Sequence, residues 1–274
     1  MIGRHPDIRA VLTESVGISR ATAYYRPKQP AKDWVLKQSI EAALREHPAY
    51  GHKRLALHLQ VNKKRILRVM HLFGLKPYRR VVKKYRKPKG IFGVYPNLLM
   101  TMTPQYPHHI WVADFTHLTW KGKVVYVATV MDVFTRRIVG VSVLSTHHTV
   151  LVVQALWNAV LHHPSPVIFH SDNGSEYNAA IFKRMLIDLN MLISRSAPGC
   201  PWENGYQESF YGKFKMDLGD PNRFLTLGTL VAEIYRTIHA YNTHRIHTAL
   251  RMPPAEFAKL TDDAIMNNTV DSVS

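Results

Sequence analysis

Three runs of β-branched and aromatic residues, separated by very short breaks, begin near residue 110. Such runs are typical of consecutive antiparallel strands, and alternating helical and strand-like patterns follow them. The expected strands cover residues 110–118, 124–134, 137–145, 167–171 and 192–196, and the expected helices between them cover 150–162 and 179–189. Because each of these elements has an apolar side to bury, the order predicts an α/β fold in which helices flank a mixed five-stranded sheet.

This order of strands and helices is that of an RNase H-like core, and further helices follow it. Asn204 is expected to cap a helix that begins at Gly205, with Gln207 returning to it as in a capping box. Residues 227–239 continue as helix. Residues 261–274 are polar and are expected to form a disordered tail.

Positive charge is confined to the first third of the chain. Residues 1–90 contain 22 Lys and Arg against 5 Asp and Glu, whereas residues 91–274 contain 14 of each. This asymmetry indicates a nucleic-acid-binding front attached to a neutral domain. A solvated basic surface without a partner is the alternative.

The basic front is expected to be helical. Residues 7–26 are predicted to form two short helices around a turn at Gly17, which resembles a helix-turn-helix. An amphipathic helix is expected at 33–47, and a second helix-turn-helix candidate follows at 54–59 and 63–73.

Asn62 is expected to cap the helix at 63–73, and Gly74 to end it. Its apolar side is predicted to consist of Ile66, Leu67, Met70 and Phe73. Its outer side carries the cations predicted to contact DNA, which are Lys63, Lys64, Arg65 and Arg68.

A basic stretch without helical or strand period follows this helix. It is interpreted as an extended arm along DNA phosphates, and a flexible solvated linker is the alternative. The predicted contacts in the arm are Arg79, Arg80, Lys83, Lys84, Arg86 and Lys87. We divide the chain into a helix-turn-helix-like segment (1–30), a helical helix-turn-helix insert (31–75), the basic arm (76–105), the core (106–222), its helical C-terminal part (223–260) and the tail (261–274).

Three acidic residues nominate a site in the core. Asp114 lies within the first expected strand, Asp172 at the end of the fourth and Glu208 in the helix after Asn204, with 35 residues between the last two. Buried carboxylates that converge repel one another, and a divalent cation relieves that repulsion. Their hard oxygen ligands suit Mg²⁺ or Mn²⁺, and two such ions suit phosphoryl transfer. Lys215, two helical turns after Glu208, is expected to hold a DNA phosphate beside the ions.

Other candidates near the trio receive different interpretations. Asp132 is expected to be structural or an ion-pair partner, Glu176 to hydrogen-bond locally, and Glu203 to favour the dipole of the following helix. Substrate contact and core packing both remain open for His170 and Trp111. Taken without further information, the trio is also compatible with three unrelated acids.

Composition excludes several classes of protein. Apolar residues make up 46% of the chain, charged residues 20%, and no apolar run approaches the length of a membrane span. The N-terminus lacks the apolar stretch of a signal peptide, and one cysteine excludes an internal disulfide. A cytoplasmic protein without a membrane partner is therefore expected.

Several motifs together resemble the second-reading-frame (orfB) transposase of bacterial insertion sequences, with its retroviral-integrase-type (DDE) catalytic core. In the core they are Trp111-Val-Ala-Asp114-Phe-Thr116, Val130-Met-Asp132-Val-Phe-Thr135-Arg-Arg137-Ile-Val-Gly140, His170-Ser-Asp172-Asn-Gly174-Ser-Glu-Tyr177 and Glu203-Asn204-Gly-Tyr-Gln-Glu208-Ser209-Phe210-Tyr-Gly-Lys-Phe-Lys215. Outside it they are Tyr50-Gly-His-Lys-Arg54, Asn62-Lys-Lys-Arg65-Ile-Leu-Arg68-Val-Met70, Tyr241-Asn242-Thr-His-Arg245-Ile-His247 and Pro254-Ala-Glu256-Phe257.

This resemblance implies a transposase that cleaves and joins DNA strands at the ends of its own mobile element. It implies that Asp114, Asp172 and Glu208 hold two Mg²⁺ ions. It also implies a frameshifted fusion with an upstream-frame protein and a homo-oligomer on DNA. Two departures concern Ile246, where the family usually has Pro, and Arg251, where it usually has Gly.

Two other functions remain as alternatives. One is a DNA-binding regulator that competes at element ends without catalysis, and the other is an RNase H-like nuclease. The intact trio argues against a pure regulator, and the basic front argues against a generic nuclease.

Overall fold

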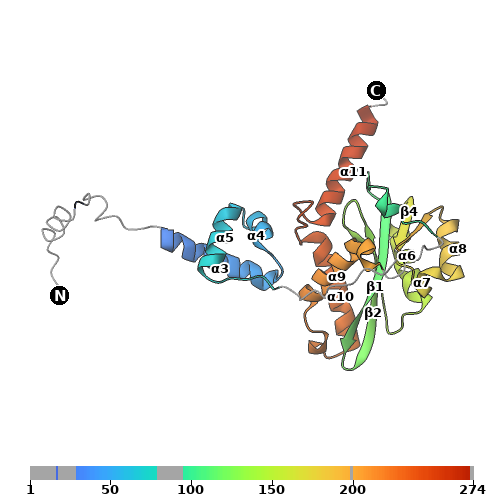
Figure 1. Ribbon diagram of the computed structural model, residues 1–274, viewed down its shortest axis with the longest axis horizontal. Helices are drawn as coiled ribbons and strands as arrows, with labels where there is room; N and C mark the ends of the chain where they lie inside the picture. The colour runs from blue at the N-terminus through green and yellow to red at the C-terminus, as the bar shows by residue number, and fades with distance from the viewer. Residues whose placement is uncertain (1–16, 18–28, 79–94, 198–199, 272–274) are drawn as a thin grey trace.

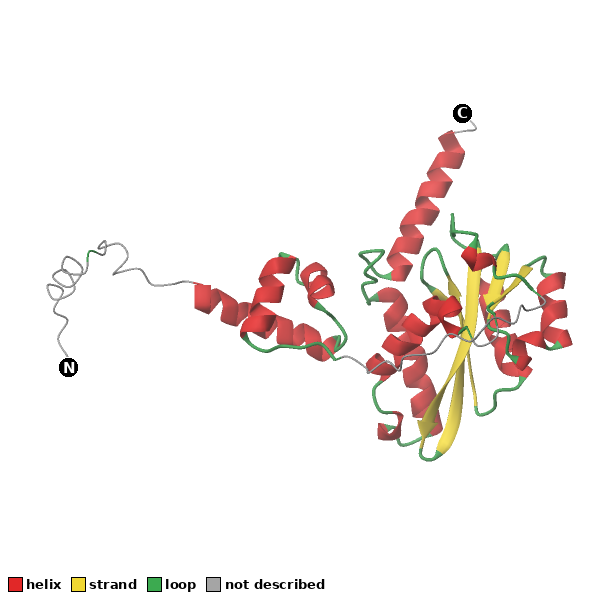
Figure 2. Ribbon diagram, in the orientation of Figure 1, coloured by secondary structure: helices red, strands yellow, loops and turns green. Residues whose placement is uncertain are grey.

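The computed structural model describes Gly17 and residues 29–78, 95–197 and 200–271. A twisted sheet lies between two layers of helices, and a smaller helical region precedes it (Figure 1). Figure 2 shows the strands gathered in the part of the molecule that follows the helical region, with helices around them, in agreement with the α/β prediction. The predicted helix-turn-helix at 7–26 and the arm residues 79–94 lie outside the described residues, apart from Gly17.

The sheet is mixed and has five strands, as the sequence predicts. Its strands are β1 (Ile110–Trp120), β2 (Lys123–Asp132), β3 (Ile138–Leu144), β4 (Ile168–Ser171) and β5 (Leu192–Arg195), arranged in the order β3-β2-β1-β4-β5. β1 pairs with β2 and β2 with β3 in antiparallel fashion, whereas β1–β4 and β4–β5 are parallel. This is the arrangement of an RNase H-like core.

Helices cover both faces of the sheet (Figure 1). One face packs against α9 (Gly205–Leu218) and α10 (Leu227–Thr243), and the other against α6 (Thr149–His162) and α8 (Ala180–Asp188). Side chains alternate along a strand, so Ile110 and Val112 of β1 point to α9 and α10 while Trp111 and Ala113 point to the other layer. The short α7 (Ser175–Asn178) follows β4.

The helical region consists of α3 (Gln29–Glu46), α4 (His52–His58) and α5 (Lys63–Leu72) around its own apolar core. The Asn62 side chain accepts a hydrogen bond from the Lys64 amide at 2.9 Å, which confirms the predicted cap. Gly74 has a φ of 64°, a conformation that suits glycine and ends the helix. The predicted inner side needs one correction, because Leu67 is exposed and Val69 is fully buried in its place.

Two expected boundaries are wrong. Residues 95–105 are not part of an arm, because the short helix η1 (Leu98–Met100) packs on the core and the Leu98 amide donates to Ser194 Oγ at 2.9 Å. The expected disordered tail is instead helical as far as Asp271, within α11 (Pro254–Asp271). No proline or glycine interrupts residues 255–271, and this composition allows the helix to continue. Two further short helices are η2 (Pro201–Asn204) and η3 (Pro221–Arg223).

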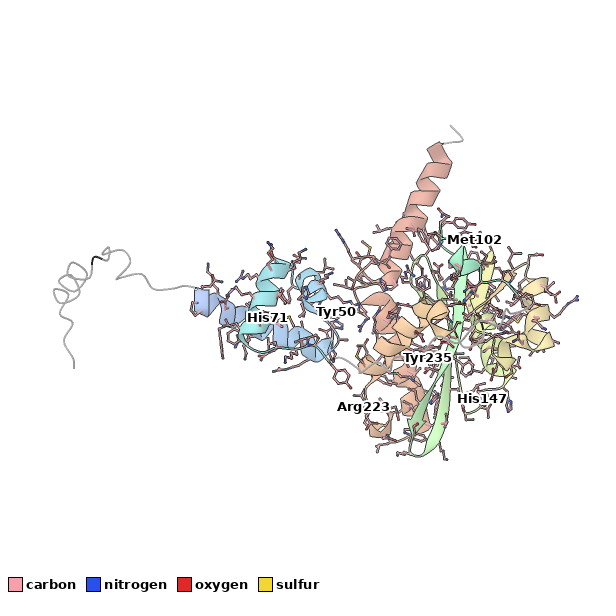
Figure 3. All side chains as sticks on the ribbon, viewed as in Figure 1. Tyr50, His71, Met102, His147, Arg223 and Tyr235 are labelled. Atoms are coloured by element: carbon pink, nitrogen blue, oxygen red, sulfur yellow. The ribbon has the colours of Figure 1, made fainter. Side chains whose placement is uncertain are left out.

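The helical region contacts the core through Tyr50, which Figure 3 labels on the side facing α9 and α10. Tyr50 is fully buried, and its hydroxyl accepts a hydrogen bond from the Ile246 amide at 2.9 Å. Ile246 in turn packs against the apolar core of the helical region. Within the described ranges, no helix combines the length and the apolar character needed to cross a membrane.

The departure at Arg251 has a structural consequence. Arg251 has a φ of 64°, the left-handed conformation in which glycine is favoured. Relief of this strain is offset in part by the greater freedom of glycine in the unfolded chain. We expect Arg251→Gly to raise the free energy of unfolding by about 0.5–1 kcal/mol, measured by thermal unfolding. Arg251→Ala removes the same side chain without relieving φ, and an equal gain from it would contradict this explanation.

Candidate active site

Asp114 of β1 and Asp172, the first residue after β4, lie at corresponding positions beyond the last paired residues of two neighbouring parallel strands. The register pairs Val112 of β1 with His170 of β4, and each aspartate lies two residues further along its chain. Adjacent strands are about 4.8 Å apart, so the two backbones run side by side along the paired residues. Asp114 also shares the strand face of Val112, which is the face that α9 covers.

Helix α9 brings Glu208 to the same edge of the sheet. Glu208 is exposed in the first turn of α9. The preceding residue, Gln207, is fully buried, and its Nε2 donates to the carbonyls of Val112 at 2.7 Å and Thr129 at 3.2 Å. Asn204 Nδ2 donates to the carbonyl of Ala113 at 3.1 Å.

The predicted capping box at the start of α9 is wrong. Neither Asn204 nor Gln207 caps α9, because both side chains reach the backbone of the sheet. Their side-chain amides donate to backbone carbonyls of β1 and β2. The start of α9 is thereby fixed on β1 beside Asp114, and Glu208 is placed with it.

Burial and two acidic neighbours raise the pKa of the Asp114 carboxyl. Its pKa is raised to about 7, first by burial and then by the Asp172 carboxylate, and Glu208 acts in the same direction. A hydrogen bond from the Phe115 amide at 2.8 Å and the Lys215 ammonium oppose this rise. Burial also raises the pKa of Asp172, against a hydrogen bond from the Gly174 amide at 3.1 Å.

Asp172 and Glu208 therefore each lie within electrostatic reach of Asp114, without forming a closed metal cluster with it. In the part of the chain that the structure describes, no three His, Cys, Asp or Glu side chains are close enough together to hold a metal ion. The donor set nevertheless suits a hard divalent cation, because all three groups are carboxylates and their mutual repulsion falls when a cation lies between them.

Comparison with known proteins gives the family. Residues 104–201 and residues 189–254 each match a family described as Integrase core domain. The transposase for insertion sequence element IS904 of Lactococcus lactis is 34% identical over 245 residues, which cover 85% of this chain and 96% of that relative. The chain belongs to the insertion-sequence transposases. The transposase for insertion sequence element IS629 of Shigella sonnei is 28% identical over 247 residues, covering 86% of this chain and 82% of that one.

Solved integrases are also similar to this transposase. An intasome of simian T-cell lymphotropic virus matches with a TM-score of 0.49 at 19% identity, over 76% of this chain and 70% of that one. The catalytic core domain of BIV integrase matches with a TM-score of 0.45 at 18% identity, over 58% of this chain and 99% of that one. The two Integrase core domain matches and the insertion-sequence relative, rather than these structures, show that the transposase has a DDE-type integrase core, as the motifs imply.

The acids outside the trio have structural partners in the transposase. Asp132 is fully buried and accepts hydrogen bonds from His108, Phe134 and Thr135, which confirms its structural interpretation. Glu176 hydrogen-bonds locally to Ser175 at 3.0 Å and also meets His147 Nδ1 at 2.8 Å.

Glu203 has a different role from the one predicted. Its Oε2 accepts from the Asn97 side chain and from the Ala197 amide, both at 2.8 Å. It therefore ties the segment before β1 to the loop before α9. His170 and Trp111, for which two interpretations remained open, are both fully buried, with His170 held between Ser194 and Ser196.

The predicted DNA contacts fall into three groups. Lys63, Lys64 and Arg65 are exposed on α5, on the side away from its apolar core. Arg68 has another role, because its guanidinium binds both carboxylate oxygens of Asp33 on α3 and holds the pKa of that carboxyl below its ordinary value. The arm residues lie outside the described residues and stay predictions; they are Arg79, Arg80, Lys83, Lys84, Arg86 and Lys87.

Proposed function

We propose that this transposase cleaves and joins DNA strands in a reaction that depends on a divalent cation held by Asp114, Asp172 and Glu208. The observation that carries the proposal is the placement of Asp114 and Asp172 at corresponding positions beyond the paired residues of two parallel strands, with Glu208 brought within electrostatic reach of Asp114 by α9. Mg²⁺ or Mn²⁺ suits these ligands, and we propose two ions.

Bound cations supply positive charge at the scissile phosphate and make water or a DNA hydroxyl a better nucleophile. The residues of the transposase hold the cation-binding carboxylates in position. Gln207 and Asn204 fix the helix that carries Glu208, and the Gly174 amide orients Asp172. Lys215 lies within electrostatic reach of Asp114 and is proposed to bind a DNA phosphate beside the cations.

The proposed partners are the ends of a mobile element and target DNA. Relatives bear the name of transposases for insertion sequence elements, which supports this choice of substrate. Exposed Lys63, Lys64 and Arg65 supply a DNA-binding surface on the helical region. A homo-oligomer on DNA and a fusion to an upstream-frame protein are part of the same proposal.

The test is a nicking and strand-joining assay with purified transposase and a duplex that carries the element's end, taken from the DNA flanking this reading frame. We expect nicked and joined products with Mg²⁺ or Mn²⁺ and neither with a chelator. Nicking of any duplex without joining would favour the nuclease alternative. Binding of the element's end without either product would favour the regulator.

The raised pKa of Asp114 predicts a dependence of stability on pH without metal. The folded-state pKa of about 7 lies above the unfolded value near 3.8, so ionisation opposes folding as pH rises through this window. Each pKa unit corresponds to about 1.4 kcal/mol, so Asp114→Asn should raise the free energy of unfolding at pH 8 by about 1–4 kcal/mol, with no gain near pH 4.

The measurement is thermal unfolding of both proteins at pH 4 and pH 8, with and without Mg²⁺. Mg²⁺ should stabilise the wild type at pH 8 and should stabilise Asp114→Asn much less. Asp188→Asn is the matched control, because Asp188 is exposed and paired with Arg184. Equal responses of Asp114→Asn and Asp188→Asn would remove Asp114 from the proposed cation site.

A further inference from the structure

A cavity of about 790 Å³ lies between the helical region and the core. Arg54 of α4 enters it from the helical region. Arg136 from the β2–β3 turn, Lys213 of α9 and His247 from the segment after α10 enter it from the core. Its remaining wall is largely apolar and includes Leu99 and Phe210. Four basic side chains from four separate elements therefore converge on one space.

Several N–H groups around this cavity are buried without acceptors. Among the residues that the structure describes, Arg54 Nε, Arg136 Nε, Arg136 Nη1 and His247 Nδ1 have no hydrogen-bond partner. Arg245 Nη2 also has no hydrogen-bond partner within this part of the chain, and only 4% of Arg245 is exposed. Buried donors of this kind are costly unless an acceptor binds to them.

Arg54, Arg136, Lys213 and His247 form a basic cluster with Arg245, and the positive charges in this cluster repel one another. The pKa of Lys213 is lowered to about 8, first by burial and then by Arg54 and Arg245. The pKa of His247 is lowered to about 4 by burial and by Lys213 and the arginines.

Two acids lie beside this basic cluster, and one of their buried oxygens, Asp217 Oδ1, has no hydrogen-bond partner among the residues described. Asp217 pairs with Arg245, and Glu203 accepts its hydrogen bonds from Asn97 and Ala197. Neither binds Arg54, Arg136 or Lys213 directly within the described residues.

The backbone holds Arg136 in the cavity at a cost. Arg136 has a φ of 62°, which an arginine adopts with strain, and its guanidinium lies 4.3 Å from the centre of the Tyr206 ring. Tyr206 and Lys213 belong to α9, the helix that carries Glu208. Backbone strain of this kind is concentrated at functional sites, including those that bind ligands.

We propose that this cavity binds a phosphate group of the DNA backbone, with Arg54, Arg136 and Lys213 as its ligands. The phosphate oxygens supply the acceptors that the buried N–H groups lack, and arginine is well suited to bind them. Because Arg54 comes from the helical region and Lys213 from α9, DNA bound here contacts both parts of the chain. The inference rests on DNA being the substrate, but not on the role of the acidic trio.

The test uses the full chain with Asp172→Asn as background, so that binding is measured without turnover. Lys213→Gln and Arg136→Gln are compared with Lys123→Gln, which removes one exposed lysine from the β1–β2 hairpin. We expect both cavity variants to bind a duplex about 5–10-fold more weakly, and the slope of log affinity against log salt to fall by about one. Lys123→Gln should change both quantities much less.

Thermal unfolding of the same proteins without DNA separates binding from a structural role. Removing one of several repelling buried cations should raise the melting temperature of Lys213→Gln, whereas loss of a structural contact would lower it. Inorganic phosphate at constant ionic strength should stabilise the background protein and not the two cavity variants.

Three results would overturn the proposal. The first is a lower melting temperature for Lys213→Gln with unchanged DNA affinity. The second is an equal loss of affinity in Lys123→Gln, which would mean a diffuse electrostatic effect. The third is stabilisation by inorganic phosphate while the cavity variants keep full DNA affinity, which would assign the cavity to a free anion.

Discussion

Asp172→Asn is expected to reduce strand cleavage and strand joining by about three orders of magnitude or more while DNA binding persists. Asp172 lies at the position after β4 that corresponds to Asp114 of β1, and its carboxylate is held by the Gly174 amide at 3.1 Å. Asparagine keeps the size of the side chain and an oxygen for that hydrogen bond, but it lacks the negative charge that a divalent cation requires. Glu208→Gln should have an effect of similar size for the same reason.

Each variant has a matched control in the same protein. Asp188→Asn removes an exposed aspartate on α8 that pairs with Arg184, and Glu256→Gln removes an exposed glutamate on α11. Both controls should retain wild-type cleavage and joining. If Asp172→Asn or Glu208→Gln joined strands as well as its control, that residue would be removed from the proposed catalytic site.

Gly140→Ala is expected to give the largest loss of stability among these predictions. A Cβ atom at Gly140 of β3 would lie 2.2 Å from the carbonyl oxygen of Ala155 and 2.8 Å from Cβ of Ala159, both on α6. The closer atom belongs to the backbone, so no change of rotamer can relieve the overlap and α6 must move off the sheet. Trp111 and Phe169 pack in the same layer and would lose contact with it.

The expected decrease in the free energy of unfolding is about 3 kcal/mol or more, or a fall in melting temperature of roughly 6–12 °C. Thermal or denaturant unfolding measures it. Gly212→Ala is the control, because Gly212 lies within α9 and a Cβ atom there meets nothing within 4 Å. That variant should be neutral or more stable by up to about 1 kcal/mol. Equal stabilities of Gly140→Ala and Gly212→Ala would show that α6 accommodates the methyl group without cost.

The strands and helices of the core follow closely from local pattern. Each predicted strand is present within two residues of its observed ends, and the predicted helices at 150–162 and 179–189 correspond to α6 and α8. Alternation of apolar residues also determines which side of β1 carries Asp114. Such periodicities depend on neighbouring residues alone, which is why a sequence reveals them.

Patterns failed where a side chain had two possible partners. Asn204 and Gln207 have the spacing of a capping box, yet both bind the backbone of the sheet. Arg68 has the position of an exposed DNA contact, yet Asp33 lies across from it on α3. Nothing in the local sequence distinguishes these outcomes, because the competing partner is distant along the chain.

The sequence by itself determined the order of the elements, the family and the identity of the three acids. Only the tertiary structure decided how these acids are placed, through the parallel pairing of β1 with β4 and the buried amide of Gln207 that fixes α9. It alone also brought Arg54, Arg136 and Lys213 to one cavity. The physical reason is that local propensity acts over one or two turns of chain, whereas electrostatic repulsion and buried hydrogen bonds depend on distances that folding creates.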